Sequence, residues 1–211
     1  MVITILELAD ISISYSLDVP LITGFSCVIK PGQLRLLRGA SGSGKSSLLS
    51  LICGTPAPAL IWSGDMYLND ISLNPIPAEQ RNIGLLFQDP LLFPHMTVAE
   101  NLAFGLAETN RKHRREAVLT ALTQAGLNGY GDRDPTSLSG GQAARIGLMR
   151  SLLAKPDALL MDEAFSSLDP DMREQFGGFV LSQIKQRHIP ALLVSHDSGD
   201  AVFASNEIIQ L

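Results

Sequence analysis

The sequence has little of what marks secreted, membrane-spanning or nucleic-acid-binding proteins. Its 211 residues include two cysteines, Cys27 and Cys53, which are too few for a disulfide framework and fall in core-like runs. No run of about 18 apolar residues is present, so we expect no membrane-spanning helix. The N-terminus lacks the basic start and cleavage site of a signal peptide. A reducing cytosol fits these absences best, and work at a membrane would require a partner.

Charge is scarce as well. Charged residues make up 18% of the chain and the net charge is −5, which argues against nucleic acid as a partner. Hydrophobic residues make up 45%, so a sizeable core can be buried and disorder is disfavoured. The length suits one large domain or two small ones.

One glycine-rich stretch matches the pattern G-x-x-x-x-G-K-S of a phosphate-binding loop: Gly39-Ala40-Ser41-Gly42-Ser43-Gly44-Lys45-Ser46. An apolar run over 34–37 predicts a strand before it, and the run 45–53 predicts a helix after it. We expect the three glycines to allow left-handed backbone angles that turn N–H groups inward around a polyphosphate. Lys45 would place a charge on the β- and γ-phosphates, and the Ser46 hydroxyl would bind Mg²⁺.

The rest of the chain reads as an α/β frame with a helical insertion. Alternating residues predict antiparallel strands before the loop, and a Pro- and Gly-rich connector is expected over 54–64. The remaining predicted elements are strands at 65–69, 83–87, 158–161, 191–194 and 208–211, and helices starting near 97, 111, 141 and 170.

Two adjacent carboxylates end the apolar run 158–161. Asp162, at the tip of the predicted strand, can hold Mg²⁺, as the second acidic element of phosphate-loop ATPases does. Glu163 can reach past the metal towards an attacking water as a general base. A strand ending in Asp-Glu is often only structural, and the phosphate loop is the feature that favours the catalytic interpretation.

The pentapeptide Leu138-Ser139-Gly140-Gly141-Gln142 is the most specific pattern in the chain. Two glycines at a helix start can bring backbone N–H groups close to an anion, and the Ser139 hydroxyl adds a donor. A glycine-rich helix start could be purely structural. This pentapeptide, placed upstream of the acidic strand, resembles the signature motif of ATP-binding-cassette (ABC) ATPases.

The chain resembles an ABC ATPase over nearly its whole length, with the motifs in the family's order. The resemblance assigns Walker A to Gly39–Ser47, including Ser47, and Walker B with its catalytic glutamate to Asp162 and Glu163. It assigns a loop glutamine that contacts Mg²⁺ to Gln88 and a histidine that contacts the γ-phosphate to His196. Tyr15 would stack on adenine, although an aromatic residue on a strand more often belongs to a core.

The resemblance also implies the fold: an ABC-type P-loop NTPase with a mixed central sheet, an antiparallel β-subdomain and an inserted α-helical subdomain. A single ABC ATPase domain would span 1–211. Its RecA-like core and β-subdomain would occupy 1–88 and 138–211, and the helical subdomain 89–137. Departures from the family pattern are Ala143-Ala144 after the signature and Ala164 after Glu163, from which we expect modest effects.

Partners follow from the resemblance. ABC ATPases pair head to tail, so Ser139, Gly140, Gly141, Gln142 and Asp169 would bind the ATP of a second ATPase subunit. A membrane permease would dock on 89–137, with candidate contacts at Leu91, Leu92, Phe93 and Met96, and a solute-binding protein would complete an importer. The chain would lie peripherally on the cytoplasmic face of the inner membrane. Because it ends at Leu211, we expect no regulation through an appended domain.

The stretch from Arg81 to Asn101 is similar to importer ATPases that serve thiamine, ferric iron, molybdate, sulfate and polyamines, and above all to the thiamine and YnjD types. An ABC exporter or lipoprotein-release ATPase is the alternative. A DNA-repair or ribosomal ABC ATPase needs coiled coils or tandem cassettes, and a P-loop kinase has no use for the signature. The basic cluster Arg111–Arg115 is either a solvated helix face or a contact to the permease or to anionic lipid.

Overall fold

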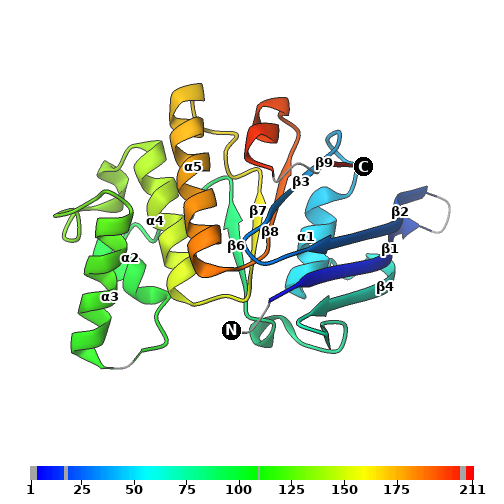
Figure 1. The fold of residues 1–211 in the computed structure, drawn as a ribbon, viewed down its shortest axis with the longest axis horizontal. Coiled ribbons are helices and arrows are strands. Elements are labelled where there is room, and N and C mark those ends of the chain that lie inside the picture. Colours follow the sequence, from blue (N-terminus) through cyan, green and yellow to red (C-terminus); the bar gives the residue numbers. More distant parts are fainter. Residues whose placement is uncertain (1–3, 17–18, 109, 205–207) are drawn as a thin grey trace.

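The computed structural model describes residues 4–16, 19–108, 110–204 and 208–211, and its N-terminal part is an antiparallel sheet. Four strands lie in the order β2-β1-β4-β5 (Figure 1): β1 (Leu6–Ser16), β2 (Val19–Ile29), β4 (Ile61–Leu68) and β5 (Ile71–Ser72). Ile11 and Ile13 of β1 face the core, as do Phe25, Cys27 and Ile29 of β2, so the predicted alternation is confirmed. The connector prediction was wrong at its end, because β4 begins at Ile61.

A five-stranded sheet forms the centre of the molecule, in the order β6-β7-β8-β3-β9. Its strands are β3 (Leu34–Arg38), β6 (Ile83–Phe87), β7 (Ala158–Asp162), β8 (Ala191–Ser195) and β9 (Ile208–Gln210). Every pairing among these described strands is parallel. The α/β fold and the antiparallel β-subdomain are confirmed, but the central sheet is parallel in all its described strands, where a mixed sheet was expected. The segments between these strands return the chain to the end of the sheet where each strand begins, and this allows parallel pairing.

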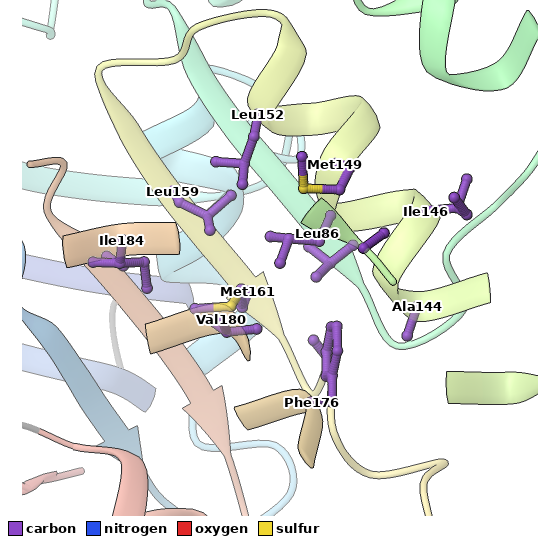
Figure 2. Close-up of a cluster of buried hydrophobic side chains, with 14 of the residues drawn as sticks. Leu86, Ala144, Ile146, Met149, Leu152, Leu159, Met161, Phe176, Val180 and Ile184 are labelled. Atoms are coloured by element: carbon purple, nitrogen blue, oxygen red, sulfur yellow. The ribbon is translucent and has the colours of Figure 1, made fainter. Parts of the chain in front are cut away.

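Helices cover both faces of the central sheet. α1 (Lys45–Cys53) packs between the two sheets, while α4 (Gly140–Leu153) and α5 (Pro170–Arg187) cover the opposite face (Figure 1). Figure 2 shows Met149 of α4 and Val180 of α5 gathered over Leu159 and Met161 of β7. Because β7 and β8 are buried on both faces, they are apolar almost throughout.

α2 (Val98–Phe104) and α3 (Arg111–Gln124) form the far end of the molecule beyond α4 (Figure 1). Thr97 and Glu100 make a capping box at the start of α2, where the sequence predicts a helix to begin. Short 3₁₀ helices occur at Ala78–Gln80 (η1), Pro135–Ser137 (η2) and Ser198–Phe203 (η3). Among the described residues, none of the helices has the length and hydropathy to cross a membrane.

The parallel strands carry the candidate functional residues to one edge. Phe87 pairs with Asp162, Asp162 with Val194, and Arg38 with Ser195, so the carboxyl ends of β6, β7, β8 and β3 are level. The residues that follow these strands directly are Gln88, Glu163, His196 and Gly39. Four segments far apart in the sequence therefore meet at the edge where α/β proteins bind ligands.

Candidate functional site

The glycine-rich loop connects β3 to α1 and has the backbone that an anion cradle requires. Gly42 and Gly44 adopt left-handed conformations, with φ of 83° and 91°. Gly39 does not, and the prediction was wrong for this residue. A Cβ atom there would lie 2.6 Å from the Ser43 hydroxyl oxygen, so any larger residue at Gly39 would require the Ser43 side chain to shift.

The start of α1 is open to an anionic ligand. Gly44 is its N-cap residue, and within the described chain no side chain caps this end and no acidic residue occupies the first turn. The N–H groups of the first turn and the helix dipole therefore favour a negative group in front of Gly44. The donor set of this loop fits a phosphate chain.

Lys45 lies across the loop. Its ammonium donates hydrogen bonds to the carbonyl oxygens of Gly39 at 2.8 Å and Ala40 at 2.7 Å, and the residue is only 6% exposed. The loop's own carbonyl oxygens thus hold the charge that the sequence assigns to phosphate. The rest of the loop, Ser41, Gly42 and Gly44, lines a cavity of about 390 Å³ together with Tyr15, Leu21, Lys45, Ser46, Ser47 and Glu163.

Tyr15 does not belong to the core, which removes the structural alternative for this residue. Its side chain is 52% exposed at the end of β1 and borders the same cavity as the loop. The phenol oxygen lies 3.4 Å from the Ser47 hydroxyl oxygen. An exposed ring beside the loop is placed where a flat apolar group could lie against it.

Ser46 and Asp162 come together from the loop and from the end of β7. The Ser46 hydroxyl donates to Asp162 Oδ1 at 3.2 Å, although the residues are 116 positions apart. Burial raises the pKa of Asp162 above its ordinary value; the Ser46 hydrogen bond opposes this shift and the neighbouring Glu163 charge adds to it. A hydroxyl and a carboxylate oxygen in contact are ligands of the kind that Mg²⁺ prefers.

The buried, ionised carboxylate of Asp162 suits a metal ligand but lowers the stability of the fold, and this cost can be measured. Since its pKa is raised in the folded state, the ionised carboxylate destabilises the fold as the pH rises through that pKa, and the cost is complete at pH 8. We expect Asp162→Asn to raise the melting temperature by about 2 °C at pH 8 in chelator-containing buffer. The gain should shrink as the pH falls towards 3.8, the ordinary pKa of an aspartate, and calorimetry of both proteins would show it. An equal gain at both pH values would contradict burial of the charged carboxylate as the cause.

Glu163 and His196 form a contact pair. The His196 Nδ1 atom lies 2.9 Å from Glu163 Oε1, and the Glu163 N–H donates to the Val194 carbonyl oxygen at 2.9 Å. Glu163 adopts a left-handed φ of 50°, which is uncommon for a residue with a side chain. This backbone turn aims a carboxylate away from the end of β7, towards the loop cavity.

Gln88 lines a second, larger cavity together with Ser46 and Asp162. A cavity of about 740 Å³ is lined by Gln88, Ser46, Asp162 and Glu163, and on its far side by Gly140, Ala143 and Ala144 of α4. Gln88 therefore borders the same space as both carboxylates without touching them. Its side chain is exposed and free to move towards a ligand.

Gly140 of the signature lines this cavity, but the other signature residues lie elsewhere. Ser139 is the N-cap of α4, and its hydroxyl oxygen accepts from the Gln142 N–H at 3.3 Å while Gln142 Oε1 accepts from the Ser139 N–H at 3.0 Å. Ser139, Gly141 and Gln142 line a separate cavity of about 250 Å³. Asp169 caps α5, accepting from the Met172 N–H at 2.9 Å. Within one chain, these residues are not brought to the phosphate loop.

One contact beside the site could not be foreseen from the sequence. Arg173, in the first turn of α5, forms an ion pair with Asp197, the residue after His196. No sequence pattern joins the two positions, because they are 24 residues apart on different elements. The adjacency of Asp197 to His196 was the only indication in the sequence.

Comparison with known proteins gives a consistent picture. A family profile described as "ABC transporter" matches residues 22–166. The chain is 42% identical over 181 residues to the uncharacterised ABC transporter ATP-binding protein YnjD of Escherichia coli K12, covering 85% of this chain and 83% of YnjD. It is 39% identical to the taurine import ATP-binding protein TauB of Pseudomonas putida KT2440, covering 98% of this chain and 78% of TauB.

Two further similarities extend over nearly the whole chain. The spermidine/putrescine import ATP-binding protein PotA of Haemophilus influenzae Rd is 37% identical over 209 residues, which are 98% of this chain and 55% of PotA. The chain thus spans about half the length of PotA. The solved dimeric structure of MJ0796, a bacterial ABC transporter cassette, has a TM-score of 0.80 and 26% identity, covering 98% of this chain and 94% of that one.

Proposed function

Since the chain belongs to the ABC transporter family, as an ATP-binding subunit with ATPase activity, we propose that it drives solute import through a separate membrane permease. Relatives named as import ATPases, TauB and PotA, match 98% of this chain and support this direction. They do not favour the exporter or lipoprotein-release alternative. The proposed location is peripheral, at the cytoplasmic face of the inner membrane.

The observation that carries the mechanism is an incomplete site. The loop, Lys45 and the pair Glu163–His196 share one edge of the sheet, whereas Ser139, Gly141 and Gln142 line a different cavity. Two chains arranged head to tail would bring the second set to the first, together with Gly140 and Asp169. The solved structure of the MJ0796 cassette is dimeric, which supports pairing of two such chains. We propose that the second ATPase subunit is an identical chain.

In this arrangement the residues at the sheet edge of one chain form half of an ATP site, and we assign each residue of this half-site a role. The loop N–H groups and Lys45 hold the β- and γ-phosphates, and the exposed Tyr15 ring lies against adenine. Ser46, Asp162 and Gln88 would hold Mg²⁺, which when bound neutralises phosphate charge.

The remaining groups act on the attacking water. Glu163 accepts a proton from the water, and its turned backbone points the carboxylate at the loop cavity. His196 holds Glu163 in place through Nδ1, and its other ring nitrogen, Nε2, is left to contact the γ-phosphate. Closure by a partner's Ser139 would add donors and exclude water.

The helical part is the proposed docking region for the permease, with subdomain limits at 89–137. Leu91 is 53% exposed and follows Pro90, which lines the cavity that Gln88 borders, and Phe104 is 62% exposed. Phe93 is partly buried, with its ring centroid 4.7 Å from that of Phe104 and an arginine, Arg150, 5.2 Å from it. Leu91 is therefore a better probe of docking than Phe93, whose replacement would also disturb the loop.

Within the basic cluster, Arg114 has a structural role. Its guanidinium donates to the carbonyl oxygens of Ala103, Leu106 and Glu108, which fixes the connection between α2 and α3. Lys112 lies 4.0 Å from Glu116, a helical pair worth little in water. A solvated helix face explains the cluster, apart from Arg114.

A transport assay tests the proposal. The chain would be co-purified with its permease and reconstituted in vesicles with ATP on the side of the chain. We expect solute uptake to the side that holds ATP, and Leu91→Asp to lower it at least tenfold while the ATPase rate of the isolated chain stays within about twofold. Ile71→Asp, at a residue that is 60% exposed on β5, is the matched control and should transport normally. Transport away from the ATP side would establish the exporter alternative instead.

A further inference from the structure

Arg173 joins two segments at the edge of the site. It lies in the first turn of α5, where its N–H donates to the Asp169 carbonyl oxygen at 2.8 Å. Its guanidinium donates to Asp197 Oδ2, and its Nε lies 3.9 Å from Asp200 Oδ1. One side chain on α5 thus contacts both carboxylates of the segment that follows His196.

The contact is partly shielded from solvent, since Asp200 is buried and Arg173 largely so, whereas Asp197 is partly exposed. The side chains of Arg173, Asp197 and Asp200 are 19%, 33% and 1% exposed. Hydrogen bonds, first from the Gly199 N–H and then from Arg173, hold the pKa of Asp197 below its ordinary value. Burial raises the pKa of Asp200, and a hydrogen bond from Ser195 and the Arg173 charge oppose that shift. The positive charge of Arg173 therefore offsets the repulsion between the neighbouring carboxylates of Asp197 and Asp200.

Asp197 passes this restraint to the backbone on both sides of His196. Its Oδ1 accepts from the Gly199 N–H at 2.8 Å, while its own N–H donates to the Ser195 hydroxyl oxygen at 3.0 Å. With Oδ2 held by Arg173, both carboxylate oxygens are occupied. The position of Asp197 therefore sets the backbone from which His196 reaches Glu163.

The other end of this segment, at Phe203, is held by packing and does not depend on Arg173. Phe203, at the end of η3, lies against Gly177 of α5, where a Cβ atom would approach the Phe203 ring to 2.3 Å. Phe203 also meets Phe165 edge to face, with ring centroids 5.4 Å apart. Aromatic packing thus fixes residue 203, whereas the end next to His196 depends on the ion pair.

We propose that Arg173 is a positioning residue that holds His196 against Glu163 through Asp197. The inference rests on the proposed function, since it assumes that His196 acts in ATP hydrolysis. Arg173 lies in the first turn of α5, directly after Asp169. Asp169 is one of the residues that we propose to contact the ATP bound by the second chain.

The kinetic test removes the guanidinium alone. We expect Arg173→Met to lower kcat for ATP hydrolysis about tenfold with KM within about twofold, because His196 is displaced but the phosphate loop is untouched. Arg173→Lys keeps one charged donor and should restore part of the loss. Lys185→Met removes a cation from the exposed face of the same helix and should leave kcat unchanged.

A double-mutant cycle separates positioning from general stability. If Arg173 acts through His196, adding Arg173→Met to His196→Ala should cost less than about twofold in kcat. The same tenfold loss in both backgrounds would overturn the inference, and so would an unchanged kcat in Arg173→Met alone.

Hydrogen exchange without nucleotide tests the role of Arg173 in holding the segment after β8, whether or not the chain hydrolyses ATP. Hydrogen exchange of residues 195–200 should accelerate in Arg173→Met and stay at the wild-type rate in Lys185→Met, while the segment around Phe203 stays protected. Unchanged exchange at 195–200 would refute the positioning role even if the ATPase rate falls. A wild-type chain without ATPase activity but with this exchange pattern would instead count against the role assigned to His196.

Discussion

Glu163→Gln is expected to lower ATP turnover by about 10²- to 10³-fold, because the amide cannot take a proton from the attacking water. The substitution retains size and an oxygen acceptor, so the 2.9 Å contact to His196 Nδ1 can persist through the amide oxygen. The phosphate loop and Lys45 are untouched, and ATP affinity should stay within a few-fold. The loss would thus appear in kcat and not in binding.

The same variant tests the half-site model. With hydrolysis blocked, ATP should hold two chains together, and light scattering after size exclusion should show a dimer that ATP removal converts to monomer. Glu174→Gln makes the same chemical change at an exposed position on α5 and should behave as wild type. A monomer at saturating ATP would refute the head-to-tail arrangement, whereas unimpaired turnover would refute the role of Glu163. The turnover measurement comes first, because the dimer test requires that hydrolysis is blocked.

The positions of the functional groups were largely predictable because they follow from strand ends. Apolar runs bounded by glycine, proline and capping residues indicated β6, β7 and β8, and parallel strands carry the residues after them to one edge of the sheet. Gln88, Glu163 and His196 are each the first residue after such a strand. Local sequence thus specified three positions that are far apart in the chain.

Contacts made by long side chains were not predictable. Lys45 turns back to its own loop, and Arg81 reaches 29 positions back to the carbonyl oxygen of Ile52 and 30 back to that of Leu51, both at 2.8 Å. Arg81 thereby caps the end of α1, and burial lowers its pKa. Flexible side chains choose partners through tertiary packing, which leaves no periodic trace in the sequence.

The start of β4 was missed because a glycine was interpreted as the end of a connector. Gly64 lies inside the strand with φ of 100°, and a Cβ atom there would lie 2.5 Å from the Asp10 carbonyl oxygen. The register of β1 against β4 shifts between Ala9 and Ser12, next to this contact. An irregularity in a strand and a turn share the same glycine preference, so sequence alone does not separate them.

Lys45→Met is expected to weaken ATP binding about 10- to 100-fold, which corresponds to the roughly 1.5–3 kcal/mol of a charge-assisted hydrogen bond. The side chain is buried at 6% exposure and its ammonium has only the carbonyls of Gly39 and Ala40 as hydrogen-bond partners within the described part of the chain. A charge held by carbonyls alone can transfer to phosphate oxygens at small cost. Titration calorimetry with ATP would measure the loss, and the exposed Lys30→Met is the control.

Thermal stability distinguishes lost affinity from a collapsed loop. ATP at about 100 times the wild-type Kd should stabilise the wild-type fold by about 2.7 kcal/mol, and a roughly 30-fold weaker variant by about 0.9 kcal/mol at the same concentration. If Lys45→Met only removes a phosphate contact, its nucleotide-free melting temperature should lie close to that of the wild type. If the ammonium also holds the loop closed, losing the donors to Gly39 and Ala40 should lower that temperature as well. Equal ATP-induced shifts in variant and wild type would show that Lys45 does not meet the phosphates.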